Sequence, residues 1–124
     1  IELRIPPPVA AGVHRVNLAE HGVRLSPAVA YQWYVAVMPD TGRRSKDILA
    51  GASLERVAVP DDLGAKVSNA TKADLPAVYA GAGIWYDAIA ALNELIDAAP
   101  QNAALRTQRS ALLREVGLPD TNIE

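Results

Sequence analysis

Several residue types are missing or scarce in this chain of 124 residues, and each absence removes a class of chemistry. The chain has no cysteine, which excludes a disulfide framework, thiolate metal ligands and a cysteine nucleophile. Its two histidines, His14 and His21, are too few for a histidine-rich metal site. No apolar run approaches the roughly 20 residues that span a bilayer. Lys and Arg number 12 against 14 Asp and Glu, and this absence of a basic surplus argues against a nucleic-acid binder.

The residues that are present favour a folded protein. Half of them are apolar and 21% are charged, so we expect a packed core rather than disorder. The length leaves room for one domain and not comfortably for two. Composition therefore predicts a folded domain and gives no reaction.

The first 60 residues have the alternation and punctuation of short antiparallel strands. We expect strands over residues 1–5, 13–18, 31–38 and 53–59, with prolines 6–8 ending the first and Pro60 the last. The segment 31–38 is rich in aromatic and β-branched residues and is apolar on both faces. The pattern predicts that it is a central strand covered on both sides.

At Pro60 the apolar period changes from that of a strand to that of a helix. Asp61 and Asp62 favour a capped helix to about residue 69, and Asp74 the start of a second. The strongest helical pattern carries Trp85, Ala88, Ile89, Leu92, Leu95 and Ile96. A last helix is predicted with Asn102 as its N-cap, Gly117 beyond its end, and Leu105, Leu112, Leu113 and Val116 facing inward.

Strands followed by helices indicate an α+β fold. We expect an antiparallel β-sheet, sandwich-like and incomplete in this chain, followed by a C-terminal helical layer of three to four helices. Residues 1–60 would form the sheet part, 61–118 the helical part packed on it, and 119–124 a fraying tail. Together these would make one domain that lacks upstream strands.

Two resemblances accompany this pattern. In the helical part, Tyr79, Gly83, Ala88, Ile89 and the segment 100–102 resemble a single tetratricopeptide-type hairpin. Stacked repeats of that type need about three copies to be stable, so we expect the hairpin to dock on the sheet.

The second resemblance runs in ordered blocks from residue 1 to 118, including HRVNLAEHGV at 14–23, YQWYVAV at 31–37 and YAGAGIWYDAIAAL at 79–92. The remaining blocks are 43–50, 54–57 and 112–118. This order is similar to a bacterial family filed as domain of unknown function 928. The resemblance implies an exported protein, periplasmic or extracellular, with further strands upstream of Ile1 and no assigned activity.

The basic loop Arg43, Arg44 and Lys46 is the one concentrated charge in the sequence. It could bind an anionic partner or surface. The alternative is a solvated loop whose charge Asp40 and Asp47 offset in part.

The aromatic residues divide into core and surface candidates. Trp33 and Trp85 lie on the apolar face of their elements, so we expect both in the core. Tyr34 and Tyr86 are adjacent to them and point elsewhere, which makes them candidates for a carbohydrate or ligand platform.

Paired carboxylates are the remaining candidates for catalysis, and each pair has a structural explanation as a loop, cap or solvated face. The pairs are Asp40 with Asp47, Asp61 with Asp62, and Glu94 with Asp97. No GxSxG, P-loop or GxGxxG motif is present.

These observations predict a non-catalytic exported binding or structural module with no catalytic residues, cofactor or metal. The alternatives are a small carbohydrate- or ligand-binding domain or, less favoured, an acid–base hydrolase or lyase. We expect a protein partner that completes the sheet, either the chain's own upstream segment or a second copy. We expect neither nucleic-acid binding nor a membrane span.

Overall fold

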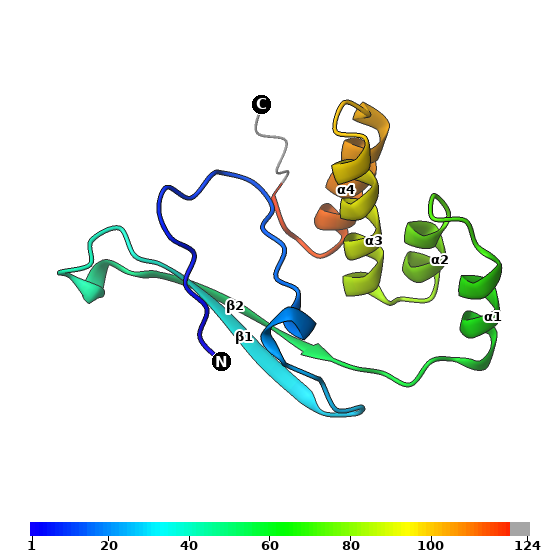
Figure 1. Cartoon of the computed structure of the whole chain (residues 1–124), viewed down its shortest axis with the longest axis horizontal. Helices are drawn as coiled ribbons and strands as arrows, with labels where there is room; N and C mark the ends of the chain where they lie inside the picture. The colour runs from blue at the N-terminus through cyan, green and yellow to red at the C-terminus, as the bar shows by residue number, and fades with distance from the viewer. Residues whose placement is uncertain (120–124) are drawn as a thin grey trace. The chain divides into compact units, whose positions relative to one another are not determined.

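The computed structural model describes residues 1–119, and the predicted tail falls outside the described residues except for Pro119. The described elements, in chain order, are the 3₁₀ helix η1 (Leu18–His21), strand β1 (Ala30–Val37), the 3₁₀ helix η2 (Arg44–Lys46), strand β2 (Ile48–Glu55), and helices α1 (Asp61–Asn69), α2 (Leu75–Gly81), α3 (Trp85–Ala98) and α4 (Ala103–Glu115) (Figure 1). An antiparallel sheet followed by four helices confirms the predicted α+β class.

The described residues divide into two compact units. One comprises residues 17–59 and contains both strands, and the other comprises residues 1–16 together with the chain from Pro60 onward. The packing of the helical part on the sheet and the sandwich-like arrangement stay predictions.

The strand unit is a β-hairpin. β1 and β2 pair antiparallel along their full lengths, from Ala30 opposite Glu55 to Val37 opposite Ile48 (Figure 1). The segments 1–5 and 13–18 form no strand, so these two predictions are wrong. Alternation alone does not make a strand, because its backbone groups need a partner, and the prolines at 6–8 offer no N–H to a ladder.

The position of the second strand also differs from the prediction. β2 covers residues 48–55 rather than 53–59. The short helix η2 reverses the chain within the predicted charged loop, and this places Ile48 directly opposite Val37. The ladder therefore begins as soon as the loop ends. Beyond its other end, an isolated parallel bridge joins Arg56 to Pro27.

The helical unit holds the core. Ala88, Leu92 and Ile96 of α3 and Leu112 of α4 are buried together. Tyr79 of α2, Ile89 and Leu105 pack against them and are partly buried. α2 and α4 both contact α3, and α1 contacts α2 (Figure 1). The predicted inward face of α3 is confirmed at Leu92 and Ile96, and Leu92 is fully buried.

Trp85 is only partly buried at the start of α3, where its indole Nε1 donates to the carbonyl oxygen of Leu112 at 3.0 Å. Val116 is exposed, so its predicted inward position is wrong. The reason is that α4 ends at Glu115, and Val116 takes the capping position outside the helix.

The helix ends follow the predicted signals in part. The Asn102 side chain accepts from the Ala104 N–H at 3.1 Å, and Gly117 adopts a left-handed φ of 75° after α4, as expected. At α1 the N-cap is Pro60, and Asp61 and Asp62 lie in the first turn instead. Asp74 takes the N-cap position of α2 without a capping hydrogen bond.

The N-terminal segment joins the helical unit through exposed charges. Arg15 Nη2 lies 3.3 Å from Asp97 Oδ2 of α3. Among the described helices, none has the length and apolar character to cross a membrane.

Candidate functional site

The hairpin has one face made of apolar side chains only. Residues opposite each other in an antiparallel pair project to the same face, and the next pair projects to the other. The register therefore places eight side chains together, which we name the apolar face: Tyr31, Trp33, Val35 and Val37 of β1, and Leu54, Ala52, Ala50 and Ile48 of β2. The predicted common face of the four β1 residues agrees with this register.

Most of the apolar face is open. None of its residues is buried, and only Tyr31 and Leu54 are partly covered. Trp33 is 38% exposed, Val35 51% and Ile48 63%. Within the strand unit, the prediction that Trp33 anchors a core is thus wrong. The covering of β1 by the helical part stays a prediction. β1 pairs with β2 alone in the described sheet, so it has no second strand neighbour within residues 1–119.

The opposite face of the hairpin is mixed in polarity. Its pairs are Ala30 with Glu55, Gln32 with Ser53, Tyr34 with Gly51, and Ala36 with Leu49. Tyr34 is 63% exposed, and its hydroxyl donates to Oε1 of Gln32 at 2.7 Å. Its ring also covers Gly51, where an added Cβ would lie 2.5 Å from Tyr34 Cδ1. The predicted surface position of Tyr34 is therefore confirmed, and its ring already has a protein neighbour.

The strands carry almost none of the residues that protect an open sheet. β1 has no charged residue and no proline, and β2 has a single charge at Glu55. Folded proteins usually place charges, prolines or bulges on a strand whose edge faces solvent. Without them, this hairpin is suited to contact with another surface.

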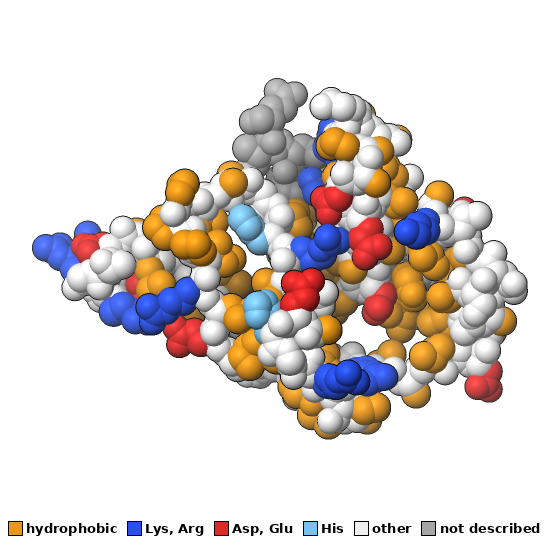
Figure 2. Space-filling model, viewed as in Figure 1, with side chains coloured by type: hydrophobic (Ala, Val, Ile, Leu, Met, Phe, Trp, Pro, Cys, Tyr) orange, Lys and Arg blue, Asp and Glu red, His pale blue; other side chains and the backbone are white. Residues whose placement is uncertain are grey.

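The tip of the hairpin gathers charges of both signs, as Figure 2 shows. Arg43, Arg44 and Lys46 are exposed, as the sequence predicted. Arg44 Nε forms an ion pair with Asp47 Oδ2 at 2.8 Å. Asp40 Oδ1 accepts from the Gly42 N–H at 2.9 Å. Both carboxylates thus stabilise the turn, and Arg44 is the one of the three basic residues that forms an ion pair.

The base of the hairpin is tied to the preceding loop. The Ser26 N–H donates to the Tyr31 hydroxyl oxygen at 2.9 Å, and the Ala28 N–H donates to the carbonyl oxygen of Arg56. The bond from Ser26 stabilises the ionised phenol and lowers the pKa of Tyr31 below its ordinary value. This end is the best covered part of the apolar face.

Tyr86, the second tyrosine candidate, belongs to the helical unit. Its ring meets Trp85 edge-to-face, with centroids 5.3 Å apart and planes at 84°. It is 41% exposed, so its predicted surface position is confirmed. Tyr34 and Tyr86 belong to different units, and the ring of each contacts a residue of its own unit.

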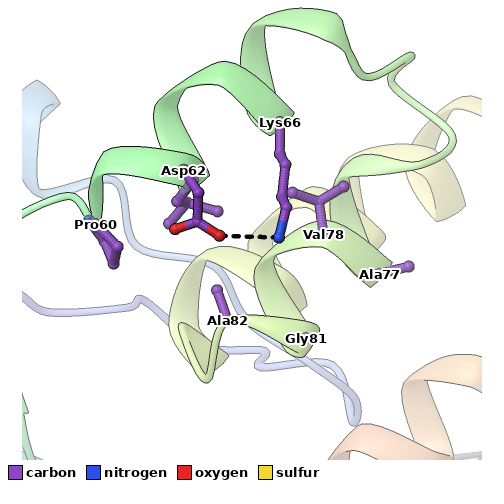
Figure 3. Close-up of a pocket in the computed structure, with 8 residues that line it drawn as sticks. Pro60, Asp62, Lys66, Ala77, Val78, Gly81 and Ala82 are labelled. Atoms are coloured by element: carbon purple, nitrogen blue, oxygen red, sulfur yellow. Dashed lines mark hydrogen bonds and ion pairs between the residues drawn. The ribbon is translucent and has the colours of Figure 1, made fainter.

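A groove between α1 and α2 was not predicted from the sequence. It encloses about 420 Å³ and is lined mainly by small and apolar residues: Pro60, Leu63, Ala77, Val78, Gly81 and Ala82 (Figure 3). Its charged residues, Asp62 and Lys66, pair with each other at 3.0 Å, and this bond lowers the pKa of Asp62. The spacing of four residues on a helix was the signal for this pair. Because the two charges satisfy each other, the groove has no free charge to orient a ligand.

The remaining chemical candidates are dispersed. His14 Nε2 lies 2.7 Å from the carbonyl oxygen of Ala10, and His21 ends η1. Of the candidate carboxylates, Asp97 pairs with Arg15 and Glu94 lies exposed on α3. Within residues 1–119, no group of three or more His, Asp or Glu residues is arranged to hold a metal ion.

The family model described as Domain of Unknown Function (DUF928) matches residues 1–124, the whole chain, and confirms the resemblance found in the sequence. No curated protein and no solved structure matches the chain.

Proposed function

Because the chain belongs to the DUF928 family, whose description assigns no activity, we propose its function from its own surfaces: it is a non-catalytic binding or structural module that acts through the hairpin. The observation that carries this proposal is the exposed apolar face. Folded proteins seldom leave such a surface in water, since each 100 Å² of apolar area costs roughly 2.5 kcal/mol when it stays exposed. A partner that covers the face recovers that free energy.

The roles of the acidic residues support a non-catalytic module. Asp40 and Asp47 are the carboxylates that an acid–base enzyme at this loop would use. Asp40 accepts from a backbone N–H of the turn, and Asp47 pairs with Arg44. Both carboxylates therefore stabilise the hairpin tip.

The aromatic residues favour a module over a carbohydrate-binding platform. Such a platform offers open aromatic faces to a sugar. The ring of Tyr34 lies over Gly51, and that of Tyr86 meets Trp85 edge-on. A ligand-binding domain built on these two residues remains the alternative function.

The partner and the location are part of the proposal. We place the module in the periplasm or outside the cell, as the family resemblance implies. Its partner is a protein, because the uncovered sheet offers apolar side chains together with backbone groups. The basic tip is a second contact region for an anionic partner or surface.

A substitution on the apolar face tests the proposal in dilute solution. Val35→Lys places a charge in the middle of the face, opposite Ala50, while the hairpin pairing is kept. We expect less binding of a hydrophobic dye and an unchanged unfolding temperature. Val59→Lys is the matched control, since Val59 is exposed but lies outside the strands. Unchanged dye binding together with a lower unfolding temperature would show that the face is covered inside the chain, and the proposal would fall.

A further inference from the structure

The apolar face has a distinct relief of large and small side chains. In its middle, the bulky Trp33 and Val35 of β1 stand opposite the small Ala52 and Ala50 of β2. The middle of the face therefore has a ridge along β1 and a trough along β2, and the larger Leu54 and Ile48 close the two ends of the trough. A partner that fits this relief needs small side chains over Trp33 and Val35 and large side chains over Ala52 and Ala50.

We propose that the partner is a second copy of this chain, with the two apolar faces stacked about a two-fold axis that runs along the strands. This inference rests on the proposed function, because it names the occupant of the same surface. The axis lies between the two sheets and midway between the strands. It brings β1 of one copy over β2 of the other at the same height, so Trp33 of each copy sits over Ala52 of the other.

The relief selects this axis over the other in-plane choice. A two-fold axis perpendicular to the strands would place β1 over β1 and leave trough against trough. The axis along the strands places Trp33 over Ala52 and Val35 over Ala50 in the middle of the interface, at the usual separation of about 10 Å between stacked sheets. At the two ends it places large side chains over each other, Tyr31 over Leu54 and Val37 over Ile48. The middle of one face thus supplies both halves of the large-over-small fit, as an isologous interface requires.

The charge distribution permits self-association. None of the eight residues of the apolar face is charged, so a symmetric pair brings no like charges together. The cations Arg43, Arg44 and Lys46 lie beyond the strands, in the tip. A charged partner would find no complementary group on this face.

The size of the face sets the expected strength of the dimer. Each strand has eight residues, and at about 3.3 Å per residue the face is roughly 26 Å long. Two strands about 4.8 Å apart make it narrow, so the interface falls below about 1,200 Å² in total, at the low end for specific association. We therefore expect a weak dimer that dissociates on dilution.

Paired charge substitutions in the full chain test both the partner and the register, with sedimentation velocity over a range of concentrations as the measurement. Val35→Lys and Ala50→Asp should each weaken self-association at least tenfold, because each buries an unpaired charge. An equimolar mixture of the two variants should recover the dimer, since the new lysine of one copy then lies over the new aspartate of the other. Ala36→Asp is the matched control on the opposite face and should associate like the parent chain.

Each other outcome overturns the inference. A parent chain that stays monomeric up to about millimolar concentration excludes the second copy, a range that covers weak protein pairs. If Ala36→Asp weakens self-association as much as Ala50→Asp does, the contact lies on another surface. The same conclusion follows if neither Val35→Lys nor Ala50→Asp weakens self-association. A mixture that does not recover the dimer refutes this register. In that last case both single variants still lose association, so the proposed function of the face stands. The dye measurement in dilute solution tests that function separately.

Discussion

Tyr34 lies across Gly51 so closely that a Cβ on Gly51 would meet its ring carbon Cδ1 at 2.5 Å and the Trp33 carbonyl oxygen at 2.6 Å. The two residues are a cross-strand pair, and the ring occupies the place of the missing side chain. An aromatic side chain over a strand glycine compensates for the packing that glycine cannot provide. The pair therefore fixes the middle of the hairpin on the face away from the apolar side chains.

Gly51→Ala should destabilise the hairpin by about 1–3 kcal/mol, the usual cost of overpacking. The clash includes backbone, so rotation of the tyrosine ring alone cannot relieve it. Amide hydrogen exchange of β1 and β2 measures the effect. Gly81→Ala is the control, because its Cβ would meet nothing within 4 Å at the end of α2. Equal protection in both variants would contradict the close packing of Tyr34.

Leu92→Ala should lower the free energy of unfolding by about 2–5 kcal/mol, as for other core leucines. Leu92 is the largest fully buried side chain in the described residues, and its loss leaves a cavity between α3 and α4. Urea unfolding followed by helical circular dichroism measures the change. Glu94→Ala, an exposed position on the same helix, should change the stability by less than about 0.5 kcal/mol. Comparable losses at both positions would reject the assignment of the buried face.

The hydrogen bond from Ser26 predicts that Tyr31 ionises below the ordinary tyrosine pKa of about 10. A folded-state pKa that is lowered adds stability above the unfolded pKa, and this gain is lost as the pH falls through the folded pKa. The difference in phenolate absorbance between the parent chain and Tyr31→Phe isolates this group. A difference curve centred at or above the ordinary value would show that the Ser26 bond does not form in solution.

Replacing Arg43, Arg44 and Lys46 by glutamine should leave the unfolding temperature nearly unchanged. Only Arg44 of the three is in an ion pair, its side chain is 74% exposed, and exposed pairs contribute no more than about 1 kcal/mol. If the tip binds an anionic partner, the triple variant should bind heparin, as a model polyanion, more weakly and with less salt dependence. Unfolding of the variant would instead assign these residues a structural role.

The helices could be predicted from the sequence because their signals are local. The period of Leu92 and Ile96, the cap at Asn102 and the glycine after α4 all act within a few residues. The strands could be predicted less well, since a strand exists only with a partner. The alternating segment 13–18 has no partner strand and forms no strand itself. The start of β2 depends on how η2 turns the chain.

The candidate site was predictable in its residues but not in its exposure. The pattern 31–37 gave the common face of Trp33 and Val35, whereas burial depends on what packs against that face. The strand unit alone does not bury Trp33, which is 38% exposed. The groove between α1 and α2 could not be foreseen, because it arises from the placement of two helices whose sequences show only their own periods.

The ion pair between Arg15 and Asp97 has a consequence for the order of folding. It joins residues that are far apart along the chain, whereas the strands of the hairpin and the successive helices are near neighbours. Contacts between near neighbours form early because they close short loops, and a distant contact forms only after that closure entropy is met. Both side chains of this pair are exposed, so the pair contributes little to the free energy of folding. We therefore expect the N-terminal segment to dock late on the helical unit and to detach early.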